Sequence, residues 1–537
     1  MDSTQPSPLT GYLLDSSLID YTVAVTNDAL RASDPALQEQ TKKRAAHALE
    51  FFLDILNPSV EEEKAQLETF RSYHAALNDP ALAESVLKTL PAPNSTPAKA
   101  DKLDLLQLTP AQKVLSLPDT LDLIFSQIPL LTKSERDTIH QASLTSHAFH
   151  NATQLRLWRR PRDLDTVEQQ VRFAFGAAIS GAISESLGHF VQRLRIRIVK
   201  GGWNMRVVQK LASLTPNLVD LTLHWGDSAD GPEAVTSESV TFIHNTLAAF
   251  FNLKTLYLAK FSYTPPIEGE LDFPADAYLP FANLESIQLY GFHWYWEPIS
   301  RGLGANLKSL DIGFGTSING SQIADLSAKL TSLKSLNIGS GLELQDVRTI
   351  VENIPGLEQV DITNFSESED TYVAGVVPLL ASLASLKSLS LSNTIGKTQV
   401  DLLVASSAPL QDVTLVLEGT PEIGDIISKL LKAKKETLRD ISFSFDDQFV
   451  LPLSDDFVNV LASIPNLQRI SVEFEPTHQL SSAPVDALLK QCPNLALTDS
   501  LEVVVTGNAL YNKVYKAKFE KARDEEEKEM EEDVLGN

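Results

Sequence analysis

Two groups of residues in this chain have a spacing that could support chemistry: three histidines and a glycine-containing turn. His140, His147 and His150 lie within about ten residues of one another, and imidazole nitrogens are common metal ligands. The alternative is that they are surface or helix-packing groups. The run Thr394–Thr398 ends like a phosphate-binding loop, but Leu391 stands where that loop needs its first glycine. Neither group forms a complete site, so we predict neither a metal nor a nucleotide here.

The single cysteine, Cys492, follows Val485, Leu488 and Leu489 at spacings typical of one helix face. We therefore expect a small buried hydrophobic residue rather than a reactive thiol. The sequence contains no Gly-x-Ser-x-Gly, His-Glu-x-x-His or Cys-x-x-Cys motif. We predict a chain that is not an enzyme and that uses no cofactor.

A repeated phrase, Leu-x-x-Leu-x-Leu with aliphatic substitutions, dominates the sequence from residue 218 onward. Its first three copies lie at 218–223, 253–258 and 284–289, and a weaker copy precedes them at 191–196. The ten copies begin 23 to 35 residues apart. A period of this length with this phrase is typical of leucine-rich repeats.

Each repeat combines two periodicities. Leu-x-Leu alternates, which predicts a strand with one apolar face. The segments between the phrases carry apolar residues at +3, +4 and +7, which predicts helices; examples are Phe457, Val460, Leu461 and Ile464. We predict an α/β solenoid with a curved parallel sheet inside and helices outside. In many leucine-rich-repeat families, an Asn or Cys three residues after the last leucine of the phrase forms a ladder of hydrogen bonds between repeats. The phrases of this chain lack that Asn or Cys.

Composition limits the classes of function. The 537 residues carry a net charge of −25, which argues against nucleic-acid binding, and no apolar run is long enough to span a membrane. The N-terminus lacks the pattern of a secretory signal, and one cysteine suits a reducing compartment. We expect a cytoplasmic or nuclear protein, and we predict no homo-oligomer.

Changes in composition suggest five segments. Pro91–Lys102 reads as a linker, Asp34-Pro35 and Asp79-Pro80 each favour a helix start, and Leu37 begins one apolar helix stripe. The acidic tail is a solvated helix or a docking site for a basic partner. The predicted divisions are an N-terminal helical segment at 1–90, a linker at 91–112, a small helical domain at 113–162, the solenoid at 163–510 and the tail at 511–537.

Residues 117–158 resemble an F-box. Leu117–Pro129 reads LPDTLDLIFSQIP, and Phe149 and Leu157-Trp158 follow at the expected places. The Cys-Pro-Asn-Leu text that begins at Cys492 is also common in the repeats of F-box proteins. The resemblance implies that a Skp-type adaptor, and through it a cullin, binds the apolar surface of Leu117, Pro118, Leu121, Ile124, Phe125 and Ile128.

The resemblance therefore implies a substrate-receptor subunit of an SCF-type, cullin–RING ubiquitin ligase, with an unknown protein target bound by the repeats. Two alternatives remain open. The F-box-like helices could cap the open end of the solenoid, because terminal repeats need caps. The whole chain could also be a repeat scaffold or inhibitor with no link to a ligase.

The outward strand positions predict the wall that faces a target. This wall begins with Arg193, Arg195 and Arg197, continues through His224 and Tyr257, and then becomes small and polar. Aromatic residues near the strand ends, beside long connections, suit a recognition rim; the alternative is that they fill their own loops. The predicted target-binding residues are Trp225, Tyr257, Tyr290, Phe292, His293, Trp294, Tyr295 and Trp296.

Overall fold

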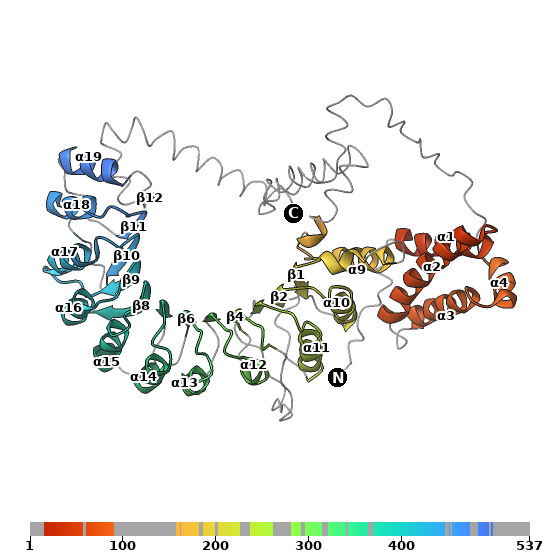
Figure 1. Ribbon diagram of the computed structural model, residues 1–537, viewed down its shortest axis with the longest axis horizontal. Helices are drawn as coiled ribbons and strands as arrows, with labels where there is room; N and C mark the ends of the chain where they lie inside the picture. The colour runs from red at the N-terminus through yellow and green to blue at the C-terminus, as the bar shows by residue number, and fades with distance from the viewer. Residues whose placement is uncertain are drawn as a thin grey trace. The chain divides into compact units, whose positions relative to one another are not determined.

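A computed structural model of the chain describes residues 16–56, 61–90, 157–161, 163–181, 186–198, 202–225, 237–260, 281–291, 296–313, 320–339, 342–363, 369–445, 451, 454–472, 482–492 and 496–497 (Figure 1). These residues belong to two compact units. Unit 1 comprises Met1–Leu284 with Trp294–Gly302, and unit 2 comprises Glu285–His293 with Leu303–Asn537. The F-box-like residues Leu117 to Phe149 and the acidic tail lie outside the described residues.

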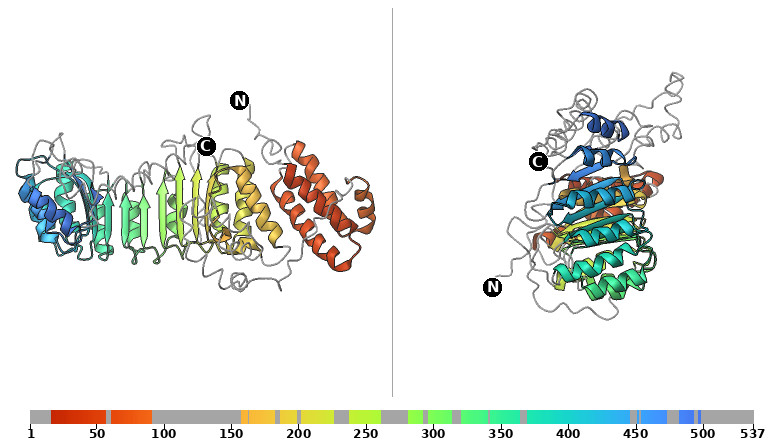
Figure 2. Two further views of the ribbon diagram at one scale, coloured as in Figure 1. Left: turned by 90° about the horizontal axis from the view of Figure 1, so that it is seen from above. Right: turned by 90° about the vertical axis from the view of Figure 1, so that its left-hand side faces the viewer.

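Parallel strands in chain order form the sheet of each unit, and the left-hand view of Figure 2 shows their common direction. Unit 1 contains β1 (Arg193–Ile198), β2 (Asp220–Trp225) and β3 (Thr255–Lys260). Unit 2 contains β4 (Ser286–Tyr290), β5 (Ser309–Ile312), β6 (Ser335–Ile338), β7 (Gln359–Ile362), β8 (Ser388–Ile395), β9 (Asp412–Leu417), β10 (Asp440–Phe445), β11 (Arg469–Val472) and β12 (Ala496–Leu497). The predicted leucine-rich-repeat solenoid is confirmed.

The repeated leucines fix the register of these strands. In unit 1, Leu194 pairs with Leu221, which pairs with Leu256, and all three side chains are buried. Residues between the leucines face the other way, as the alternating burial of β1 shows. A one-residue slip would expose every leucine, so the hydrophobic pattern specifies the pairing.

One helix follows most strands and covers the leucine face. In unit 1 these helices are α9 (Val167–Ser180), α10 (Gly202–Leu214), α11 (Ser237–Ala248) and α12 (Trp296–Gly302). In unit 2 they are α13 (Gly320–Ser327), α14 (Leu344–Asn353), α15 (Glu369–Ala381), α16 (Lys397–Ala405), α17 (Ile423–Lys434), α18 (Asp455–Ala462) and α19 (Ser482–Gln491). The predicted stripe of α18 is buried along its whole length.

Cys492 is buried, as predicted. Its Sγ lies 3.4 Å from the carbonyl oxygen of Ile464, the residue that holds the same slot one repeat earlier. Burial raises the pKa of the thiol to about 11, so it stays protonated and unreactive at neutral pH.

Asparagines link neighbouring repeats at a position that the sequence analysis did not consider. The asparagine that precedes the first leucine of a phrase donates its Nδ2 hydrogen to a backbone carbonyl of the preceding repeat. These bonds run from Asn217 to His189 at 2.9 Å, from Asn252 to Pro216 at 3.1 Å and from Asn466 to Glu436 at 3.1 Å. They satisfy carbonyl groups in the turns that no strand partner reaches.

The N-terminal helices are α1 (Ser16–Arg31), α2 (Pro35–Ile55), α3 (Glu61–Ala76) and α4 (Pro80–Leu87), which confirms a helical N-terminal segment over the described residues 16–56 and 61–90. The predicted start of α4 is confirmed, because Asp79 caps it by accepting hydrogen bonds from the backbone amides of Ala81 and Leu82. One detail was wrong: Leu37 is 54% exposed, since it lies in the first turn of α2, before the helix reaches its buried face.

These N-terminal helices cap the first repeat of the solenoid. Helix α2 packs against α9 and α10, and Figure 1 shows it beside them. Phe51 and Phe52 of α2 lie with ring centroids 5.3 and 5.6 Å from Phe175 of α9, and Tyr21 of α1 meets the same ring edge-on at 5.9 Å. Tyr21 is 41% exposed, whereas the three phenylalanines are buried, and burying each of those rings is worth about 1.5–3 kcal/mol.

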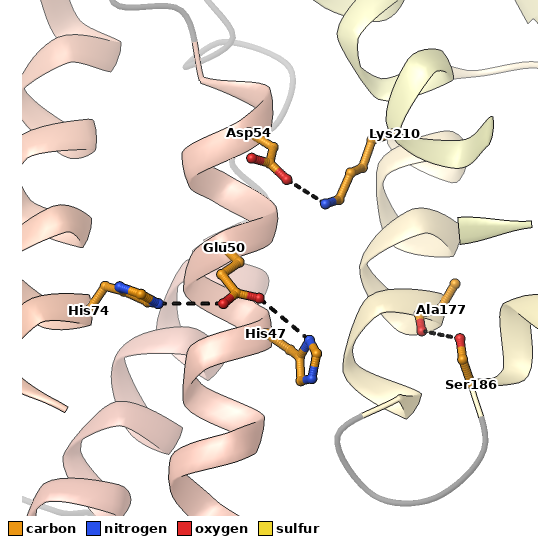
Figure 3. A network of polar contacts seen from close by, with 7 residues as sticks. All are labelled: His47, Glu50, Asp54, His74, Ala177, Ser186 and Lys210. Carbon is orange, nitrogen blue, oxygen red and sulfur yellow. Dashed lines mark hydrogen bonds and ion pairs between the residues drawn. The ribbon is translucent and has the colours of Figure 1, made fainter. Parts of the chain in front are cut away.

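Polar contacts also join the cap to α10 and link side chains within the cap (Figure 3). The Lys210 ammonium on α10 pairs with the Asp54 carboxylate, and Arg206 donates to the carbonyl oxygen of Leu56 at 2.8 Å. Within the cap, Glu50 lies between His47 and His74, 3.6 Å from each ring. The contacts on α10 fix the C-terminal end of α2 against the solenoid.

Candidate functional site

Two strand faces opposite the leucine core present outward side chains, one in each unit. We call the face of β1–β3 in unit 1 the arginine wall; its residues are Arg193, Arg195, Arg197, Asp220, Thr222, His224, Thr255 and Tyr257. We call the face of β4–β11 in unit 2 the aspartate wall. Its central row, one residue per strand in register, is Gln288, Asp311, Asn337, Asp361, Ser390, Thr414, Ser442 and Ser471.

The arginines of β1 are exposed, as predicted, but unit 1 itself supplies carboxylates to them. Arg193 Nε lies 2.5 Å from Asp220 Oδ2, and Arg195 Nη1 lies 3.0 Å from Asp163 Oδ2. Such exposed ion pairs add only ~0.2–1 kcal/mol each to stability. Their consequence is electrostatic, because they cancel much of the positive charge that the sequence suggested.

His224 and Tyr257 form the aromatic part of the arginine wall. Their ring centroids lie 5.3 Å apart, and His224 is only 8% exposed. Burial, followed by the charge of Arg195, lowers the pKa of His224 below its ordinary value. The imidazole is therefore neutral at neutral pH and acts as a packing group on this wall.

The residues of the predicted aromatic rim differ in their exposure to solvent. Tyr257 and Tyr290 are partly exposed on their walls, whereas Trp225 and Trp296 are buried at 8% and 4% exposure. For these two tryptophans, core packing is the observed arrangement, because one ends β2 against the leucine face and the other begins α12. Phe292, His293, Trp294 and Tyr295 lie outside the described residues, so their role stays a prediction.

Tyr290 is held in place at the end of β4. Its hydroxyl donates a hydrogen bond to Asp311 Oδ2 at 2.8 Å. Its ring covers Gly313 so closely that a Cβ at that position would lie 2.1 Å from the ring atoms Cδ1 and Cε1. The sequence analysis missed this arrangement, and the only available signal was a glycine two residues after the aspartate of β5.

Two carboxylates of the aspartate wall are partly withdrawn from water. Burial raises the pKa of Asp311, the Tyr290 hydrogen bond lowers it, and the charge of Asp361 raises it further. Burial also raises the pKa of Asp361, and a hydrogen bond with Ser390 opposes that shift. One oxygen of each carboxylate, Oδ1, is enclosed and has no hydrogen-bond partner among the described residues.

The lysines of these repeats lie at the beginning of the strands rather than on the central row. Lys308 Nζ lies 2.6 Å from Glu285, and Glu358 lies 3.2 Å from Lys334 and 2.6 Å from Lys387. The hydrogen bonds from Lys387 and Lys334 lower the pKa of Glu358. Neighbouring repeats of unit 2 are thus linked by ion pairs that use up these cations.

The turn after β8 does not suit a phosphate. Gly396 precedes α16, and a Cβ built there would lie 2.9 Å from Glu418 Oε2. The Lys397 ammonium lies 3.4 Å from Glu422. A carboxylate beside the turn repels an anion such as a phosphate.

Within the described ranges, no group of three or more His, Cys, Asp or Glu side chains is arranged to hold a metal ion. The described helices include none with both the length and the apolar character that a bilayer crossing requires. The features that the two units do present are long strand faces with fixed side chains. Such faces suit the binding of another molecule.

The predicted adaptor-binding residues, Leu117, Pro118, Leu121, Ile124, Phe125 and Ile128, all lie outside the described residues. The end of the F-box-like segment is described. Trp158 stacks on Phe173 of α9 with ring centroids 4.8 Å apart. This last part of the segment therefore packs on the first repeat of unit 1.

Comparisons with known proteins find similarity among solved structures only. No protein-family model matches the chain, and no curated protein matches it. Among solved structures, a chain in the crystal structure of the Rad7 and Elc1 complex in yeast is similar at 14% identity and a TM-score of 0.39, over 71% of this chain and 92% of that one. A likeness this distant implies neither a shared function nor shared partners.

Proposed function

We propose that this chain is the substrate-receptor subunit of an SCF-type ubiquitin ligase, acting in the cytoplasm or nucleus. The F-box-like segment binds a Skp-type adaptor and through it a cullin, and the repeat walls bind the target protein. The chain performs no chemistry of its own. It increases the effective concentration of the target near the ubiquitin-loading module, which is catalysis by proximity.

The observation that carries this proposal is the cap formed by α1–α4. A solenoid needs one cap at its first repeat, and α2 already covers α9 and α10 there through Phe51, Phe52 and Phe175. The apolar F-box-like residues are thus not required as a cap. The apolar sequence pattern of residues 117–128 is better explained by a partner helix.

A scaffold without a ligase link remains the second candidate function, and a specific contact favours it. Trp158 of the F-box-like segment stacks on Phe173 of α9. If the rest of that segment packs on unit 1 in the same way, no apolar surface is left for an adaptor. Target binding by the walls would be unaffected.

A pull-down with a purified Skp-type adaptor separates the two functions. The full chain is expected to retain the adaptor, and Pro118→Glu with Ile124→Glu is expected to abolish retention. The matched control, Leu37→Glu with Leu402→Glu, places two charges at exposed apolar positions elsewhere and should leave retention unchanged. Absence of adaptor binding by the unaltered chain would overturn the ligase proposal and favour the scaffold.

A further inference from the structure

Asp311 and Asp361 form the part of the aspartate wall that lacks a counter-ion. They lie on β5 and β7, with Asn337 between them in register, so about 10 Å separates their positions on the sheet. Neither forms an ion pair among the described residues, and no lysine or arginine contributes to the pKa shift of either group. Negative charge on this stretch of wall is therefore uncompensated.

The far end of the same wall shows the contrast. Asp412 and Asp440 are register neighbours on β9 and β10, and the charge of Asp440 raises the pKa of Asp412. There, Arg439 and Arg469 oppose the shift, and Arg469 pairs in register with Asp440. Among the residues that the structure describes, cations lie beside one pair of wall carboxylates and not beside the other.

Folding already removes part of the water around the carboxylates of Asp311 and Asp361, so a partner does not bear the full free-energy cost of removing it. One oxygen of each is enclosed without a hydrogen bond in the described part of the chain. A cation that reaches such a carboxylate gains more than it would at a fully hydrated one, because the local dielectric constant is lower. The folded wall is thus prepared for positive charge.

Tyr290 adds a second feature that suits a cationic side chain. Its ring is fixed between Gly313 and Asp311, with the hydroxyl bonded to the carboxylate, so it loses little freedom on binding. An aromatic ring beside a carboxylate attracts Arg and Lys through both the ring face and the charge. Small residues, Ser309 and Ser335, flank this stretch and leave the strands approachable.

From this arrangement we propose that the stretch of the aspartate wall from Tyr290 to Asp361 binds an extended, arginine- or lysine-bearing segment of a partner protein. Two cations of the segment reach Asp311 and Asp361, and the Tyr290 ring packs on one cationic stem. In the polyproline II conformation three residues make one turn and span ~9 Å, so cations at every third position lie on one side of the segment and match the two carboxylates. Nucleic acids do not fit, because phosphates would meet the same uncompensated charge.

This inference deepens the proposed function by naming the class of target, and its test needs no adaptor, so the two proposals can fail separately. The probe is a fluorescein-labelled peptide of Arg-Gly-Ser repeats, titrated with the full-length chain at physiological salt by fluorescence anisotropy. The variant Asp311→Asn with Asp361→Asn is expected to weaken binding by about tenfold or more. Tyr290→Ala is expected to weaken it several-fold.

The matched control removes the same charge from the outer helices. Glu352→Gln on α14 with Asp401→Asn on α16 is expected to change affinity less than about twofold, since exposed charges this far from the site are screened. Equal losses in both double variants would mean diffuse attraction by a chain of net charge −25 and would overturn the proposal. Absence of binding by the peptide, or equal binding of a Glu-Gly-Ser peptide, would also overturn it.

Discussion

The arginine wall and the aspartate wall are built from the same repeated phrase, yet they treat charge in opposite ways. In unit 1 each of two exposed arginines has an aspartate of the same unit beside it, as in the pair Arg195–Asp163. In the described part of unit 2, Lys308, Lys334 and Lys387 lie at the strand starts, and no cation lies beside the central carboxylates Asp311 and Asp361. Repeat geometry fixes where a side chain points, but the pairing of charges decides which wall still attracts a partner.

The cap packs within unit 1, so removing the α9 ring on which it packs should affect the two units differently. Phe175→Ala is expected to destabilise unit 1 by about 3–5 kcal/mol, because Phe51, Phe52 and Tyr21 all pack on that ring. Hydrogen exchange should show faster opening of β1 and α9 with little change in β9 and β10.

Phe251→Ala is the control for the cap, because that phenylalanine belongs to unit 1 but is 54% exposed. Its expected cost is within about 0.5 kcal/mol. An equal loss of protection in both units after Phe175→Ala would contradict the view that the cap stabilises unit 1 locally.

A smaller change should disturb the aspartate wall alone. Gly313→Ala places a methyl group where the Tyr290 ring lies, so the ring must move and its hydrogen bond to Asp311 is lost. We expect a loss of about 1–3 kcal/mol, measured by thermal unfolding. In a Tyr290→Ala background the same glycine change should cost much less, and an equal cost in both backgrounds would show that the ring is not the obstacle.

The smallest expected effects concern the pH dependence of stability, and they have opposite signs on the two walls. The folded-state pKa of His224 is lowered from 6.5, so unit 1 loses stability as the pH falls through 6.5 toward that lower value. The pKa values of Asp311 and Asp361 are raised from 3.8, so unit 2 gains stability as the pH falls through their folded values toward 3.8.

Hydrogen exchange across this pH range, corrected for intrinsic exchange rates, measures both trends. His224→Gln should remove the contribution from β2, and Asp311→Asn with Asp361→Asn should remove the contribution from β5 and β7. A variant that leaves the pH dependence of its own strand unchanged would contradict the burial of that group as the cause.

Much of the fold was predictable because the repeated phrase contains both of its periodicities. The alternation around Leu221 and Leu223 gave the strand faces, and the +3, +4, +7 spacing before Cys492 gave a buried thiol, which the structure confirms. Local signals such as Asp79-Pro80 located a helix start. These features depend on neighbours in the chain, so one sequence is enough to find them.

The binding surface was less predictable. Trp225 and Trp296 were expected on a rim and are buried, since whether an indole at a strand end turns inward depends on the helix packed beside it. The contact of Tyr290 with Gly313 joins two repeats, and the cap joins α2 to α9 across more than a hundred residues. Such contacts leave no periodic trace in the sequence.

The sequence by itself determined the strand register, the leucine core, the outward direction of the wall residues and the excess of negative charge. Tertiary structure alone decided that helices α1–α4 cap the solenoid and that Arg193 and Arg195 are neutralised within unit 1. It also decided that Asp311 and Asp361 have no counter-ion among the described residues of unit 2. The physical reason is the separation along the chain over which each effect acts. Hydrophobic periodicity acts between residues a few positions apart, whereas the compensation of a charge depends on which distant side chains folding brings within a few ångströms of it.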